Sequence, residues 1–290
     1  MSARTKGSLC GFTIYNETAY GTTGSDSYFG GVLTSLETPD DETLEYDQGC
    51  GTRQWINVVP TMQSFGWKAD FTEPSGDDRT WPLWFMLAMG ALDGSVPDDL
   101  PSFSALFRIG SDEWMQSTGC KVNGLTVSAD AFGSVLKWKV DAMAKKNTFL
   151  AVNTLTPEIR PDSRPVTYGQ KWQRNGTAIP VKSWTLSISN SLVGDPGLDS
   201  DGKGLAAGDG SVPGGSTDIT LELMVTSTGN TWDLLKQTGA DDDTLTLSID
   251  GYTITASGCF LRTDYPNRSQ SPYDETIAYI VKTLTLELEE

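Results

Sequence analysis

The fold class is decided by the stretch Leu245-Thr246-Leu247-Ser248-Ile249-Asp250-Gly251-Tyr252-Thr253-Ile254. Apolar residues alternate with threonine and serine on both sides of Asp250-Gly251. Alternation with a period of two is typical of a β-strand with one buried and one wetter face. Asp-Gly supplies the positive φ angles that a two-residue hairpin turn needs. The stretch therefore predicts an antiparallel hairpin.

The same alternation recurs along the chain and predicts a protein built mainly of strands. Strands are expected within residues 136–142, 181–192, 219–225 and 284–288. Residues 55–71 predict two strands around Pro60, because proline interrupts the hydrogen bonds of a sheet.

Only two short helices are predicted. The first covers residues 80–89, with Thr80 as a cap, Pro82 in the first turn and Gly90 as the stop. The second covers residues 230–237, before Gly239.

These helices form part of an internal repeat. In each copy an alternating strand precedes the helix, Thr80-Trp81 matches Thr231-Trp232, Thr118-Gly119-Cys120 matches Ser257-Gly258-Cys259, and a long alternating strand closes the copy. Four matches in one order favour a duplication, the alternative being chance likeness between β-rich segments. Trp81, Trp232, Cys120 and Cys259 are the expected core anchors of the two copies.

The repeat divides the chain into four parts. We expect an N-terminal arm over residues 1–52, a first β unit over 53–150, an extended Pro-containing linker over 151–180 and a second β unit over 181–290. Within the second unit, residues 193–216 form a long loop rich in Gly, Asp and Ser.

Composition excludes several kinds of chemistry. The 290 residues include 21 Lys+Arg, 38 Asp+Glu and no histidine, for a net charge of −17. Imidazole-based triads and His-containing metal sites are therefore excluded. The acidic balance also argues against a surface that holds nucleic acid tightly.

Motif searches find no catalytic site, and we expect neither an enzyme nor a cofactor. Asp199-Ser200-Asp201-Gly202 fails the spacing of an EF-hand, although an incidental cation site there stays open. Phosphate-binding glycine loops and Gly-x-Ser-x-Gly are absent from the sequence. The four cysteines are expected to be reduced and buried. No apolar run long enough for a membrane span occurs.

Three further segments carry a resemblance to a known family. They are Asn-Glu-Thr-Ala-Tyr-Gly-Thr at 16–22, Gly-Cys-Lys-Val-Asn-Gly-Leu-Thr-Val-Ser at 119–128, and the alternating strand at 181–192 followed, after the long loop, by Ile-Thr-Leu-Glu-Leu at 219–223. In this order they resemble the tail tube (major tail) proteins of long-tailed viruses of bacteria and archaea.

The resemblance implies an all-β fold with two tandem β-sandwich or barrel-like units, each with a short helix. Such units assemble a continuous inner β-barrel in a ring, and stacked rings form the conduit for genome ejection. It further implies a homotrimer with pseudo-sixfold symmetry, with a hexamer as the alternative. The expected partners are other copies of the chain, other tail proteins, and double-stranded DNA in transit without tight binding. The expected location is the virion tail, assembled in the host cytoplasm, with no membrane partner.

Candidate residues follow from this expectation. The acids expected to face the bore are Asp141, Glu222, Glu287 and Glu289; Lys137 and Lys139 share a face with Asp141, which argues against that assignment in the first unit. The acids of the candidate ring-stacking loop are Asp195, Asp199, Asp201 and Asp209. The N-terminal arm is a second candidate for contacts between rings.

Other functions stay open at this point. A tail terminator or another virion connector is the nearest alternative. A carbohydrate-binding β-sandwich module would need aromatic residues exposed on one face. A carboxylate-based hydrolase would need a carboxylate buried beside an apolar cluster.

Overall fold

The structure, a computed structural model, describes residues 11–38, 41–47, 57–95, 99–109, 113–151, 154–158, 163–192, 194–195, 206–207, 217–226, 243–261 and 274–289. Across these ranges the regular structure is almost entirely β-strand, with one α-helix, α1 (Trp81–Met89), and one 3-10 helix, η1 (Gly76–Asp78). The expectation of an all-β fold is confirmed.

The strands, in chain order, are β1 (Gly11–Ala19), β2 (Thr22–Glu37), β3 (Asp41–Asp47), β4 (Asn57–Thr72), β5 (Phe103–Arg108), β6 (Trp114–Ala129), β7 (Lys137–Ala144), β8 (Lys146–Leu150), β9 (Gln173–Arg174), β10 (Thr177–Ala178), β11 (Val181–Ser189), β12 (Gly194–Asp195), β13 (Ala206–Ala207), β14 (Asp218–Thr226), β15 (Thr244–Ile249), β16 (Tyr252–Leu261) and β17 (Asp274–Leu288). All but β12 and β13 belong to one sheet.

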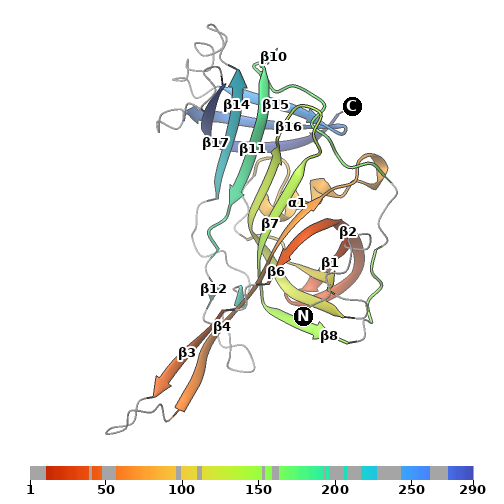
Figure 1. Cartoon of the computed structure of the whole chain (residues 1–290), viewed down its shortest axis with the longest axis vertical. Helices are drawn as coiled ribbons and strands as arrows, with labels where there is room; N and C mark the ends of the chain where they lie inside the picture. Colours follow the sequence, from red (N-terminus) through yellow and green to blue (C-terminus); the bar gives the residue numbers. More distant parts are fainter. Residues whose placement is uncertain are drawn as a thin grey trace.

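Two groups of strands in this sheet have the same neighbour order. In the first strand set the order is β5-β6-β7-β4-β2, and in the second strand set it is β15-β16-β17-β14-β11. The two sets join where β6 pairs with β11, from Gly124–Ser189 to Ala129–Trp184. In Figure 1 the second set lies at the upper end, and β1, β2 and β8 lie below it.

The predicted hairpin is confirmed as β15 and β16. Ile249 pairs with Tyr252, and the turn between them has φ of 49° at Asp250 and 80° at Gly251. The strands expected from alternation are also present as β7, β11, β14 and β17.

The prediction of two strands around Pro60 is wrong, because β4 runs unbroken from Asn57 to Thr72. Pro60 lies opposite Leu44 in a part of β4 that, among the described strands, pairs with β3 alone. A proline without an N–H is tolerated there, since one edge of each strand is not engaged in the sheet. This two-stranded part extends away from the rest of the molecule at the lower left of Figure 1.

Helix α1 confirms the first predicted helix. It has Pro82 in its first turn and ends at Gly90, whose φ is 80° and whose N–H donates to Met86 O at 2.7 Å. Thr80 does not cap the helix with its side chain. Most of α1 is buried, which suits its apolar sequence. The second predicted helix, 230–237, lies outside the described residues.

Segments expected to be an arm and a linker contribute to the core. β1 and β2 lie within residues 1–52, yet β1 pairs with β5 and β2 pairs with β4. Phe12 in β1 is 1% exposed, and Tyr168 and Trp172 in the 151–180 segment are fully buried. Trp172 packs edge-on against Trp184 of β11 at 5.6 Å. β1, β2 and the part of the 151–180 segment around Tyr168 and Trp172 therefore belong to the packed body, whereas β3 lies in the two-stranded part that extends away from it.

Candidate functional site

One row of side chains crosses both strand sets on the face of the sheet that we call the polar face. The row passes through directly paired residues on β2, β4, β7, β6, β11, β14, β17 and β16, which are Ser35, Asp70, Lys139, Thr126, Ser187, Thr220, Ile280 and Phe260. Every neighbouring pair is antiparallel. The row crosses from the first set to the second where the hydroxyls of Thr126 and Ser187 lie 3.4 Å apart.

The opposite face of these strands is apolar and buried. Its residues alternate with those of the row, and they include Ala69, Val140, Val127, Leu186, Leu221 and Tyr279. Burial of this face drives the sheet to form, since each large apolar side chain removed from water contributes about 1.5–3 kcal/mol. The polar face is the wetter of the two faces, as is common for an antiparallel sheet.

Both ends of the row are open strand edges among the described residues. β1 pairs with β2 only as far as Val32, short of Ser35. β15 pairs with β16 from Tyr252 to Ser257, and Cys259 N also donates to Asp243 O at 3.3 Å, so the described edge of β16 is open only from Phe260 onward. Open edges invite pairing with another strand.

Two glycines mark matching positions in the two sets. Gly119 in β6 and Gly258 in β16 both have φ of 62°. A Cβ on Gly119 would lie 2.6 Å from Lys145 Cβ, and a Cβ on Gly258 would lie 2.8 Å from Lys282 Cβ. These two pairs align β6 with β16, and β7 and β8 with β17.

The alignment exposes a stagger between the sets. Lys139 lies six residues before Lys145, so it matches Thr276, six residues before Lys282. The row through Lys139, however, reaches β17 at Ile280, four residues further along. β7 and β17 are four strands apart along the row. Over these four steps, the row therefore shifts by four residues relative to the matching positions of the two sets.

The acids predicted to face a bore lie in two places. Asp141 and Glu222 both point to the polar face, two residues from the row on β7 and β14. Glu287 is exposed near the end of β17, opposite Thr253. Glu289 is exposed beyond β17 and accepts a hydrogen bond from Thr253 Oγ1 at 2.9 Å.

The charges on β4 and β7 are of both signs. Asp141 lies 3.3 Å from Lys68, and Lys139 stands opposite Asp70. Lys137 forms an ion pair with Asp130. Exposed pairs of this kind contribute little to stability, but they make this part of the polar face nearly neutral.

The candidate stacking loop is described only in part. Asp195 lies in β12, which pairs with β13, and β13 contacts β6 and β7. Asp199, Asp201 and Asp209 lie outside the described residues.

Three of the expected core anchors are buried. Trp81 is fully buried and packs edge-on against Tyr252 of the second set at 5.2 Å. Cys120 and Cys259 are buried free thiols, and burial raises the pKa of Cys120 to about 12 and that of Cys259 to about 11. Both thiols are therefore protonated and unreactive at neutral pH. Trp232, Cys10 and Cys50 lie outside the described residues.

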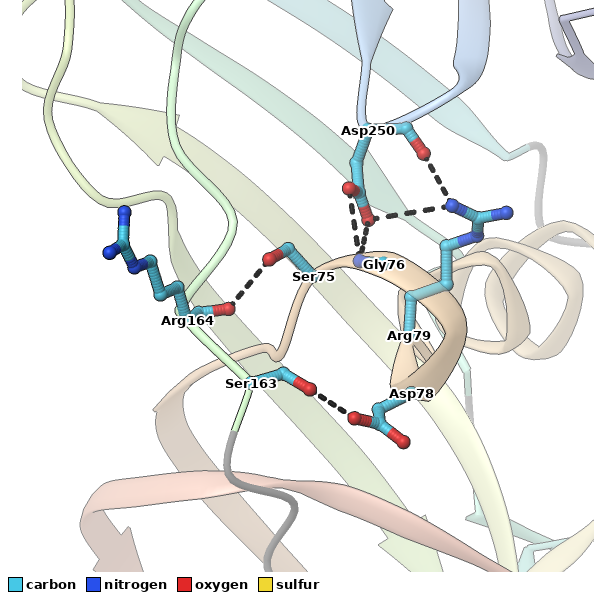
Figure 2. A network of polar contacts seen from close by, with 7 residues as sticks. All are labelled: Ser75, Gly76, Asp78, Arg79, Ser163, Arg164 and Asp250. Carbon is cyan, nitrogen blue, oxygen red and sulfur yellow. Dashed lines mark hydrogen bonds and ion pairs between the residues drawn. The ribbon is translucent and has the colours of Figure 1, made fainter.

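A polar network links the two sets next to the decisive hairpin turn (Figure 2). The Asp250 carboxylate accepts from Gly76 N at 3.1 Å, and Arg79 Nη1 donates to Asp250 O at 2.8 Å. The Arg79 guanidinium also lies over the Tyr252 ring, 5.1 Å from its centroid. Ser75 Oγ donates to Arg164 O at 2.8 Å, which ties in the 151–180 segment.

Sequence reasoning missed a buried carboxyl, Glu73. It is 1% exposed, accepts from Trp84 Nε1 at 3.0 Å and lies 2.9 Å from Thr80 Oγ1. Thr80 Oγ1 also donates to Phe29 O at 2.6 Å. Burial raises the pKa of Glu73 to about 8. The arrangement suits a neutral carboxyl, because its own O–H can donate a hydrogen bond to Thr80 Oγ1.

The signal for Glu73 was present in the alternation of β4. Trp67, Ala69 and Phe71 are buried at every second position, and Glu73 is the next member of that series. The cavity beside it is only about 50 Å³. A glycosidase site needs a second carboxyl facing the first, and Glu73 is the only buried acidic residue among those whose side-chain burial the structure describes.

Other kinds of site were sought in the same ranges. There is no cluster of three or more potential metal ligands among the described residues. Within those ranges, no helix has the length and apolar character to cross a membrane. The exposed phenylalanines are separated along the fold, with Phe149 on β8, Phe260 on β16 and Phe132 in the turn between β6 and β7, whereas a sugar-binding platform gathers aromatic rings on one face.

Comparison with known proteins found no matching family model and no matching curated protein. Function is therefore argued from the motifs and from the geometry above.

Proposed function

We propose that this chain is a structural subunit of a viral tail tube, which stacks in rings to form a conduit for DNA. The observation that carries the proposal is the row of paired residues that crosses eight strands and ends in two open edges. Because the eight strands alternate in direction, β2 of a second copy would meet β16 of the first in antiparallel orientation. That contact would repeat the β6–β11 pairing found within the chain.

The proposal includes two tandem tube units, represented by the two strand sets. Their common strand order and the matched pairs Gly119–Lys145 and Gly258–Lys282 support a duplicated unit. Three chains arranged head to tail would give a wall of about 24 strands and pseudo-sixfold symmetry.

The stagger supports closure of this wall into a barrel. A displacement of four residues over four strand steps amounts to one residue per strand. Barrels in which stagger equals strand number have strands tilted by about 36°. With strands about 4.8 Å apart, a 24-strand wall would be about 45 Å across between backbones. A DNA duplex fits inside such a wall.

The polar face suits a bore through which DNA slides. Its row is rich in serine and threonine, its lysines stand near acids, and the whole chain carries a net charge of −17. Tight binding to phosphates would require clustered, unneutralised Lys and Arg. Asp141 and Glu222 are the acids that we assign to the bore, and the open edges are the contacts within a ring.

Electron microscopy of the purified chain over a concentration series tests the proposal. Rings or stacked tubes with a central channel, and a ring mass three times the 31.4 kDa of the chain, are expected. A chain that stays monomeric at every concentration and ionic strength would overturn it.

A charge reversal tests the lining of the bore. Glu222→Lys should make assembled tubes retain DNA, and the retention should weaken steeply with salt. Asp77→Lys makes the same charge change at an exposed position of η1 and should leave DNA unbound. Equal retention by both variants would contradict the assignment of the polar face to the bore.

A further inference from the structure

Matching positions in the two strand sets differ sharply in exposure. Leu286 of β17 lies four residues after Lys282, and Phe149 of β8 lies four residues after Lys145. The two residues also pair with matching partners, Ile254 and Met115. Leu286 is 5% exposed, but Phe149 is 62% exposed.

The segment that connects β4 to β5, which includes α1, explains why Leu286 is covered. After α1 the chain runs along β17, where Leu286 N donates to Leu92 O at 2.9 Å. Gly94 follows so closely that a Cβ there would lie 2.6 Å from Thr283 Cγ2. The edge of β8 that carries Phe149 has no such cover, because β8 pairs with β6 alone among the described strands.

A second pair of positions repeats the contrast. Ile249 is the last residue of β15 and Ile109 directly follows β5, and the alignment of β6 with β16 makes these two isoleucines equivalent. Ile249 is 3% exposed, at the turn where Arg79 and Trp81 pack on Tyr252. Ile109 is 44% exposed.

The two exposed residues lie at the same end of one small sheet. Ile109 N donates to Glu113 O at 2.9 Å, and Trp114 pairs with Leu150, the neighbour of Phe149. We call the surface around Ile109 and Phe149 the β5–β8 surface. Its counterpart in the second set is covered by the segment between β4 and β5 of the same chain.

We propose that the β5–β8 surface is an interface for a second copy of this chain, whose second β unit covers it. The reason is equivalence: Leu286 and Ile249, two apolar residues that are covered in the second set, have the apolar counterparts Phe149 and Ile109, which are still exposed. The second copy approaches from the correct side, since the open edge of β2 belongs to the first set and would adjoin the neighbour's β16. The inference rests on the head-to-tail assembly of the proposed function.

Paired aspartate substitutions test the interface. Ile109→Asp combined with Phe149→Asp should raise the concentration at which half the protein assembles by about 100-fold or more, because burying two charges at an interface core is costly. Both residues are exposed in the single chain, so circular dichroism and the melting temperature of the monomer should stay as in the wild type. Phe132→Asp, at the turn at the other end of β6 and also exposed, should assemble as the wild type does. Sedimentation velocity over a concentration series measures all three proteins.

Cysteine labelling gives a second reading that does not depend on weakening the assembly. Ile109→Cys or Phe149→Cys, each combined with Cys10→Ser and Cys50→Ser, leaves only buried native thiols at Cys120 and Cys259. Assembly should slow maleimide labelling at either engineered cysteine by about tenfold or more, whereas Phe132→Cys should react equally in both states.

The outcomes separate the inference from the proposed function. If the wild type assembles while the double aspartate variant assembles equally well and labelling is unprotected, the interface is overturned and the tube subunit stands. If the wild type never assembles, both fail together.

Discussion

The two strand sets reach the same strand order with different side chains. At one matched pair of positions, Trp67 of β4 faces Ala142 of β7, whereas Leu221 of β14 faces Tyr279 of β17. The large ring sits on one strand in the first set and on its partner in the second. Cross-strand pairs that conserve total volume are tolerated in a packed core. The comparison teaches that alternation and the glycine positions specify strand order, whereas the larger side chain of a cross-strand pair can lie on either strand.

The largest effect expected from this comparison is truncation of Trp67. Trp67→Ala should lower the free energy of unfolding by about 4 kcal/mol, because the indole is fully buried among Phe103, Phe107 and Trp84. Leu221→Ala, at the matched position, should cost about 3 kcal/mol. Urea denaturation measures both, with Thr220→Ala on the polar face as a control near zero. A larger loss of unfolding free energy in Leu221→Ala than in Trp67→Ala would contradict the comparison.

Ionisation of Glu73 should produce the next largest effect on the free energy of unfolding. Glu73 continues β4, so this effect concerns the first set alone. The folded-state pKa of about 8 lies above the unfolded value near 4.5, so the folded state holds the extra proton. The contribution of Glu73 to stability is therefore greatest below pH 4.5 and falls as pH rises toward 8. The slope approaches about 1.4 kcal/mol per pH unit, and the loss between pH 5 and 8 is about 3–4 kcal/mol.

Glu73→Gln keeps the shape of the side chain without the titration, so its unfolding free energy should lose this slope. Denaturation series at pH 5, 6, 7 and 8 compare the two proteins. A wild-type slope that survives in Glu73→Gln would assign the pH dependence to other groups.

The smallest effect on stability is expected from alanine substitutions that test whether Gly119 and Gly258 are equivalent. Alanine at either position should cost about 2–3 kcal/mol, because a left-handed φ costs about 1 kcal/mol or more and the new Cβ also meets a lysine Cβ. Gly133→Ala is the control: its φ is 84°, and no atom lies within 4 Å of the added Cβ, so only the backbone cost of about 1 kcal/mol remains. Thermal melts of the three variants would show whether the two β6 and β16 positions behave alike.

Local features of the fold were predictable from the sequence. The Asp250-Gly251 turn, the alternating strands and the stop of α1 at Gly90 each depend on neighbouring residues, and each is present. The continuity of β4 through Pro60 was not predictable, since it depends on which strand lies beside it.

Features that depend on distant pairing were beyond the sequence pattern. The β6–β11 junction joins Thr126 to Ser187, and alternation alone does not say which of several alternating strands become neighbours. For the same reason, the pattern does not distinguish Phe149 from Leu286, because exposure depends on what packs over each strand. The acids Asp141 and Glu222 were correctly placed on the wetter face of their strands, but the ion pair with Lys68 required the β4–β7 register.

The β6–β11 junction has a further consequence for assembly by mass action. In a closed ring built from these chains, every second contact between strand sets would be intramolecular and would form on folding at any dilution. Only the remaining contacts would depend on protein concentration, so half as many encounters would complete the ring. Tethering raises the effective concentration of the second strand set to the millimolar range or above. A dilute subunit would therefore already hold one of its two junctions before it meets a neighbour.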